Sequence, residues 1–158
     1  MTRLIAILFL LVSALPGIMP AQEAAKDSIA VLLGSAKQDT SKVNILLEMG
    51  RTLYRSAPKE AIEYSRQAIE LSRKLGFRKG LALANKHAGL AHYVSGEYAE
   101  AINYYQEARL AFESIADQAG IANILSNMGA IYNNFGEDTK ALDLYFEAQK
   151  AAEKMEKE

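Results

Sequence analysis

Residues 80–119 read GLALANKHAGLAHYVSGEYAEAINYYQEARLAFESIADQA, and residues 120–158 read GIANILSNMGAIYNNFGEDTKALDLYFEAQKAAEKMEKE. The second stretch repeats the first at a distance of 40 residues, most clearly at its small and aromatic positions. The matched pairs are Gly80 and Gly120, Gly89 and Gly129, Gly96 and Gly136, Ala101 and Ala141, Tyr105 and Tyr145, and Ala108 and Ala148. A fainter copy precedes them, in which Ala61 and Ala68 stand 40 residues before Ala101 and Ala108. A fixed period of this length predicts one supersecondary unit that is used about three times.

Each unit has the pattern of two helices joined by a short turn. Apolar and small residues recur every three or four positions on both sides of a break. Gly96 and Gly136 stand at two of these breaks, where a helix can end in the left-handed region, and Pro58 suits the first turn of a helix. The pattern predicts helices near 41–55, 58–75, 79–95, 97–115, 119–135 and 137–156.

Four positions in each unit carry a family resemblance. Gly89 is followed by Ala101, Tyr105 and Ala108, at 12, 16 and 19 positions, and Gly129 is followed in the same way. This pattern resembles the tetratricopeptide repeat, in which small residues let two helices approach and the aromatic ring fills the gap beside them. The resemblance implies an all-α, right-handed superhelical solenoid of helix-turn-helix hairpins, with about three repeats plus an N-terminal helix. The first copy departs from the pattern because Ser65 stands at the aromatic position.

The period of 40 is longer than the usual 34 of the family. It resembles the variant found in the N-terminal regions of bacterial sensory proteins. We expect repeats at 41–78, 79–118 and 119–158.

The N-terminus has the pattern of a secretory signal. Arg3 precedes an apolar run over 4–12, and Ala21 offers a small residue for cleavage. We therefore expect a signal peptide at 1–21 and an exported, periplasmic or extracellular protein, with an uncleaved N-terminal anchor as the alternative. Residues 22–40 should form a helix near 24–34, which covers the exposed face of the first repeat, and then a loop with Asp39 or Thr40 as a helix N-cap.

Composition excludes several kinds of site. The chain has no cysteine, so it lacks disulfides, thiolate metal ligands and cysteine nucleophiles. A net charge of −1 does not suit nucleic acid. Its two histidines, His87 and His92, point about 140° apart on a helix and cannot easily share a metal. His92 replaces a packing tyrosine, so we expect a half-buried structural role for it. Serines and acids form no catalytic constellation. We expect no enzyme, metal or cofactor.

The resemblance places a binding groove on the concave side, which the first helix of every repeat lines. The groove residues in this register are Asn44, Leu47, Arg51 and Tyr54 in the first repeat, Leu83, Lys86, His87, Leu90 and Tyr93 in the second, and Asn123, Ser126, Asn127, Ala130 and Asn133 in the third. Amides, two cations and apolar side chains together suit an extended or helical peptide. The set does not match the carboxylate clamp that the family uses for chaperone tails, whose positions are occupied here by Leu47, Arg51, His87, Asn123 and Asn127.

These patterns favour an exported scaffold that binds a protein or peptide partner. The alternative is the N-terminal sensory region of a longer bacterial nucleotide cyclase or histidine kinase. A membrane enters only through an uncleaved signal or such a longer protein. The last helix carries Leu142, Tyr145, Phe146 and Ala148, and no capping helix follows it in the sequence. We expect some of these side chains to be partly uncovered, either because further chain follows or because the chain forms a homo-oligomer through this face.

Overall fold

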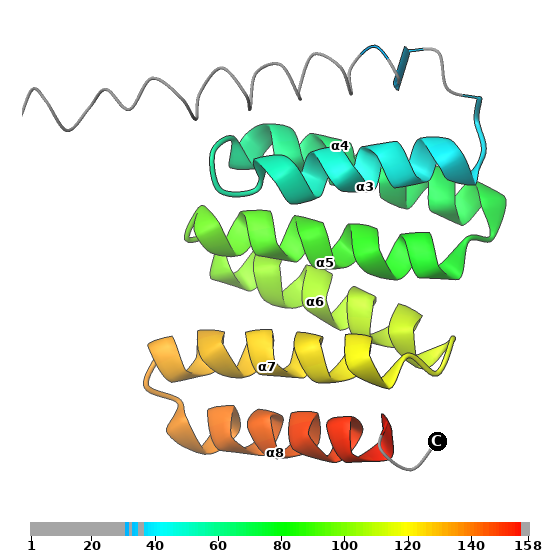
Figure 1. The fold of residues 1–158 in the computed structure, drawn as a ribbon. Helices are drawn as coiled ribbons and strands as arrows, with labels where there is room; N and C mark the ends of the chain where they lie inside the picture. Colours follow the sequence, from blue (N-terminus) through cyan, green and yellow to red (C-terminus); the bar gives the residue numbers. More distant parts are fainter. Residues whose placement is uncertain (1–30, 32, 35–36, 156–158) are drawn as a thin grey trace, which may run out of the picture. The chain divides into compact units, whose positions relative to one another are not determined.

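The computed structural model describes residues 31, 33–34 and 37–155. The chain divides after Ser35, and six helices without any strand make up the described residues of the second part (Figure 1). These helices are α3 (Thr40–Leu53), α4 (Pro58–Leu75), α5 (Arg78–Val94), α6 (Tyr98–Glu113), α7 (Gln118–Asn134) and α8 (Asp138–Met155). Every helix end lies within two residues of its predicted position.

Two N-terminal predictions concern residues that the structure leaves mostly undescribed. The predicted signal at 1–21 lies outside the described residues. So does most of the helix predicted near 24–34, of which Val31, Leu33 and Gly34 are described and helical. None of the described helices combines the length and the hydropathy that a membrane-spanning helix requires.

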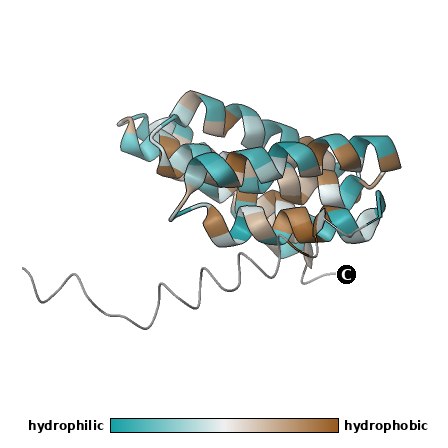
Figure 2. Cartoon of the chain, turned by 90° about the horizontal axis from the view of Figure 1, so that it is seen from above, coloured by the Kyte–Doolittle hydropathy of each residue, from teal (hydrophilic) through white to brown (hydrophobic). Residues whose placement is uncertain are grey.

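The six helices form three antiparallel hairpins that follow one another along the stack (Figure 1). The helices of each hairpin pack against each other, and α4 packs on α5 as α6 packs on α7. The first helices of the first two hairpins, α3 and α5, are also in contact. Coloured by hydropathy, the helices present a mixture of hydrophilic and hydrophobic faces (Figure 2). This arrangement is the all-α repeat solenoid that the periodicity predicts.

The helix starts show why the repeats begin where they do. Asp39 is the N-cap of α3, because its carboxylate accepts a hydrogen bond of 2.9 Å from the Ser41 amide. Asp117 plays the same part for α7, accepting one of 2.8 Å from the Gly120 amide. Pro58 occupies the first turn of α4, as predicted. The predicted cap at Asp39 is confirmed.

Residues in the left-handed backbone conformation follow several of the helices at their turns. Gly96 and Gly136 have φ values of 77° and 73°, which confirms the predicted role of these two glycines. The turn between the first two repeats uses Gly76 at φ 65°. Forty residues later Ala116 takes the same place at φ 56°, although it has a Cβ that disfavours this conformation.

The hairpins are held by a small residue facing a ring. A Cβ added to Gly89 would lie 2.6 Å from the ring of Tyr105, so only glycine lets α5 and α6 approach this closely. Gly129 and Tyr145 repeat the contact between α7 and α8. Tyr105 is fully buried, and the core around it joins α5, α6, α7 and α8. In the first hairpin Ser65 replaces the ring, and its buried hydroxyl has no hydrogen-bond partner.

Candidate functional site

The candidate site is the inner wall, defined as the fourteen predicted groove residues on α3, α5 and α7. Their side chains differ widely in exposure. Asn44, Arg51, Asn123 and Asn133 are exposed, Tyr54, Leu83, Lys86, Leu90, Tyr93, Ser126, Asn127 and Ala130 are half-buried, and Leu47 and His87 are buried. Twelve of the fourteen therefore offer surface to a partner.

Leu47 and His87 are corrections to the predicted groove. The predicted groove needs them accessible, yet they are only 6% and 8% exposed. The cause is the close contact between α3 and α5, since a Cβ on Gly50 would lie 3.6 Å from Cβ of His87. Burial lowers the pKa of His87 to about 4, and the charge of Lys86 beside it acts in the same direction. His87 is therefore a neutral packing residue at physiological pH.

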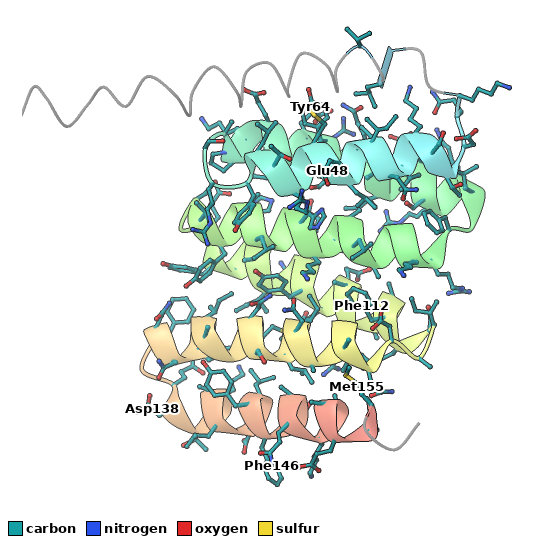
Figure 3. All side chains as sticks on the ribbon, viewed as in Figure 1. Glu48, Tyr64, Phe112, Asp138, Phe146 and Met155 are labelled. Atoms are coloured by element: carbon teal, nitrogen blue, oxygen red, sulfur yellow. The ribbon has the colours of Figure 1, made fainter. Side chains whose placement is uncertain are left out.

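Arg51 already has an acidic partner within its own helix. Its Nε donates to a carboxylate oxygen of Glu48 at 2.9 Å, and a second nitrogen bonds the other oxygen (Figure 3 labels Glu48). The hydrogen bond from Arg51 lowers the pKa of Glu48, which fixes the pair in its charged form. Glu48 was not among the residues predicted from the sequence, although its spacing of three residues from Arg51 is the usual signal for such a pair. Arg51 is thus held beside an acid in an exposed ion pair.

Lys86 is the second cation on the wall and is placed differently. It is half-buried between Leu83 and Leu90, which lie on the same face of α5 and pack against the core. Burial lowers the pKa of Lys86, while the charge of the Asp117 carboxylate opposes that effect. Lys86 makes none of the ion pairs found between described residues.

The third repeat contributes amides to the wall. Asn127 Nδ2 donates to Asn123 Oδ1 at 3.4 Å, one turn away on α7. Each amide has more donors and acceptors than this one bond uses. Ser126 is different, because its hydroxyl donates to the Ala122 carbonyl oxygen at 2.9 Å. The hydrogen-bonding capacity of this part of the wall therefore rests on Asn123 and Asn127, together with the exposed Asn133 further along α7.

Tyr93 of the wall belongs to a group of aromatic side chains near the turns of the second and third repeats. The rings of Tyr93 and Tyr98 lie 5.6 Å apart, and Tyr98 meets Phe135 edge to face at 5.4 Å. Asn134 Nδ2 donates to the Tyr93 hydroxyl at 3.3 Å, which ties α7 to α5. These contacts connect the second and third repeats. Tyr93 therefore contributes to the junction as well as to the wall.

The family model for the tetratricopeptide repeat matches residues 80–154, which span α5 to α8 apart from their outermost residues. This segment therefore matches the sequence pattern of tetratricopeptide repeats. Among solved structures, it is similar to the crystal structure of the TPR domain of Arabidopsis FLU, with a TM-score of 0.65 and 22% sequence identity. That match covers 75% of this chain and 98% of the other, and it shows the shared fold. A search of curated proteins finds no match.

The second histidine, His92, packs within one helical hairpin of the repeat. His92 Nδ1 lies 2.6 Å from a carboxylate oxygen of Glu97, across the turn that Gly96 forms. Its ring stacks on Tyr104, with centroids 5.1 Å apart and planes inclined by 14°. His92 is half-buried and packed within one hairpin, as expected for a residue that replaces a packing tyrosine. No cluster of potential metal ligands occurs among the described residues.

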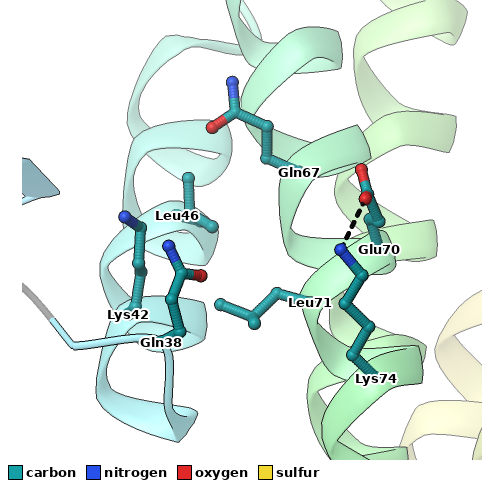
Figure 4. Close-up of a pocket in the computed structure, with 7 residues that line it drawn as sticks. All are labelled: Gln38, Lys42, Leu46, Gln67, Glu70, Leu71 and Lys74. Atoms are coloured by element: carbon teal, nitrogen blue, oxygen red, sulfur yellow. Dashed lines mark hydrogen bonds and ion pairs between the residues drawn. The ribbon is translucent and has the colours of Figure 1, made fainter.

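A pocket of about 260 Å³ opens between α3 and α4, away from the inner wall (Figure 4). Its lining residues are Gln38, Lys42, Leu46, Gln67, Glu70, Leu71 and Lys74. A second pocket, of about 330 Å³, is lined by Arg109 and Glu113 of α6 as well as by residues of α7 and α8. Its α8 residues Glu147, Lys150, Ala151 and Lys154 stand 80 residues after Gln67, Glu70, Leu71 and Lys74, so this part of the lining recurs with the repeat.

Proposed function

We propose that this chain binds a polypeptide segment of a partner protein along its inner wall, and that its role is binding rather than catalysis. The proposal is supported by the kinds of group that occupy the predicted wall. Lys86 and two leucines of α5, Leu83 and Leu90, are half-buried, and Asn123 and Asn127 occupy the register of α7 that corresponds to Leu83 and His87. Amides can pair with a peptide backbone, and leucines can receive an apolar side chain.

The two cations of the wall suggest the chemistry of the partner. Arg51 is paired with Glu48 in an exposed ion pair, so an acid of a partner would compete with Glu48 for it. Lys86 has no such pair among the described residues, and its partial burial makes an opposite charge more valuable than at an exposed site. We therefore propose a partner segment that places an acidic residue next to a branched aliphatic one.

A selection from a randomised peptide library with the purified full-length chain tests this. Peptides that bind should carry an acid close to Leu, Ile or Val. Lys86→Glu should weaken the binding of a selected peptide about tenfold or more, and changing the peptide's acid to lysine should restore binding to that variant. The matched control is Lys59→Glu, since Lys59 is an exposed lysine on α4, away from the wall.

Two outcomes would contradict the proposed site. One is a selected peptide whose affinity is unchanged by Lys86→Glu, and the other is a peptide weakened as much by Lys59→Glu as by Lys86→Glu. The first would remove Lys86 from the interface. The second would show a general charge effect instead of a local contact.

We also propose that the binding takes place outside the cytoplasm. The support is Arg3 followed by the apolar run over 4–12 and by Ala21, in the order that secretory signals use. The intact mass of the protein recovered from its native host is expected to place the N-terminus at or near Gln22. Retention of Met1 would overturn the cleaved signal and favour an N-terminal anchor.

A further inference from the structure

The last helix exposes apolar side chains along one edge. Leu142 is 67% exposed and Phe146 is 58% exposed, one helical turn apart, and Tyr145 beside them is 38% exposed. Phe146 points away from α7 (Figure 3). These three apolar side chains are neighbours on α8 and form one contiguous patch, the kind of surface at which proteins associate. Ala148, on the opposite side of α8, is buried.

The repeat register shows which of these side chains a further packed helix would cover. Tyr105, the equivalent of Tyr145, is 1% exposed, and Ile102, the equivalent of Leu142, is half-buried against the core. Gln106 is the equivalent of Phe146, and it stays exposed although α7 packs on α6. A helix packed on α8 as α7 packs on α6 would therefore cover the first two positions and leave Phe146 in water.

We propose that the α8 edge, defined as Leu142, Phe146, Asp143 and Lys150, binds the same edge of a second copy of this chain in an antiparallel, two-fold pair. Leu142 and Phe146 lie on one line along the helix, so pairing along that line covers both side chains. A two-fold contact needs one self-complementary patch and closes after two copies.

The charges on the edge favour the antiparallel direction. Asp143 and Lys150 are seven residues apart, so they lie on the same flank of α8, two turns from each other. With Phe146 near the axis, Asp143 of each copy lies opposite the partner's Lys150. A parallel pair would place like charges together. Lys150 Nζ already lies 4.5 Å from the centre of the Phe146 ring, which keeps this cation on the edge.

Sedimentation of the full-length chain from micromolar to millimolar concentration tests the proposal. The wild type should form dimers, and Phe146→Gln should raise the dimer dissociation constant about tenfold or more. This variant installs the residue that α6 carries at the same position, so the fold is retained. Leu110→Gln is the matched control, because Leu110 is an apolar residue of α6 that is 55% exposed and lies off the α8 edge.

A charge exchange tests the direction of the pair. Asp143→Lys and Lys150→Glu should each weaken the dimer about threefold, and the two changes together should restore it. A monomer at every concentration, a ladder of higher oligomers, or a dimer that Phe146→Gln leaves as stable as Leu110→Gln does would overturn the proposal. Failure of the double variant to recover would exclude the antiparallel pair.

Discussion

Lowering the pH from about 7 to about 4 should destabilise the protein through one buried side chain, His87. In the folded chain its pKa is about 4, with burial as the main cause, whereas an unfolded histidine titrates near 6.5. Between these values the unfolded state binds more protons at this histidine, so the contribution of His87 to stability falls as the pH falls through this window and stays constant below it. The difference corresponds to about 3 kcal/mol, at about 1.36 kcal/mol for each pH unit.

The charged neighbours of His87 act in both directions. Lys86 and Arg51 lower its pKa, and Glu48 raises it. The carboxylate of Glu48 also loses stabilisation in acid, because its pKa is lowered by Arg51. Most of that loss is common to the wild type and to a His87→Gln variant, because the hydrogen bond from Arg51 is the largest cause of the Glu48 shift and His87 a smaller one. The difference between the two proteins therefore reports mainly the contribution of His87.

Urea unfolding followed by circular dichroism at a series of pH values measures this difference. We expect the wild type to lose about 3 kcal/mol more than His87→Gln between about pH 7 and about pH 4. Nuclear magnetic resonance of the imidazole ring provides a direct check in the folded state. Parallel pH profiles for the two proteins, or a folded His87 that titrates near 6.5, would refute the burial of a neutral ring at this junction.

The backbone offers two further predictions, both measurable by urea unfolding. Ala116→Gly should stabilise the chain by about 1 kcal/mol, because φ is 56° there. Gly76→Ala should destabilise it by a similar amount at the equivalent turn. Equal free energies of unfolding for the wild type and these two variants would contradict this. Gly89→Ala should cost about 1–3 kcal/mol, since its Cβ would overlap the buried ring of Tyr105. Gly129→Ala should cost less, because the ring it meets is partly exposed and can move.

The fold could be predicted because its constraints recur in the sequence. Gly89 with Tyr105 and Gly129 with Tyr145 satisfy the same contact, and glycines at the turns satisfy the same backbone requirement. A second copy of each signal reduces the chance that a pattern is accidental. The exception is Ala116, because alanine does not indicate a positive φ. The structure shows that Ala116 adopts the same backbone conformation as Gly76 at the equivalent turn.

The site was predicted less completely, since wall residues depend on contacts between helices. Register alone places Leu47 and His87 on the same face as Lys86, yet the approach of α3 to α5 buries the first two and leaves the third half-buried. Whether a side chain is buried between two helices depends on its length and direction, and residue spacing along one helix does not predict this. The Glu48–Arg51 pair was readable from sequence, but its consequence for binding needed the observed bidentate geometry.

Binding and self-association use different edges of the solenoid, so the two proposals can fail separately. Lys86 lies on the inner wall of α5, whereas Phe146 lies on the outward side of α8. The chain therefore allows a crossed experiment, in which peptide affinity and dimer dissociation are both measured in each variant. Lys86→Glu should change only the first and Phe146→Gln only the second, since distant sites usually act additively. If Phe146→Gln also changed peptide affinity, then the wall would be completed by the second copy, and the binding site would have to be redrawn across the dimer.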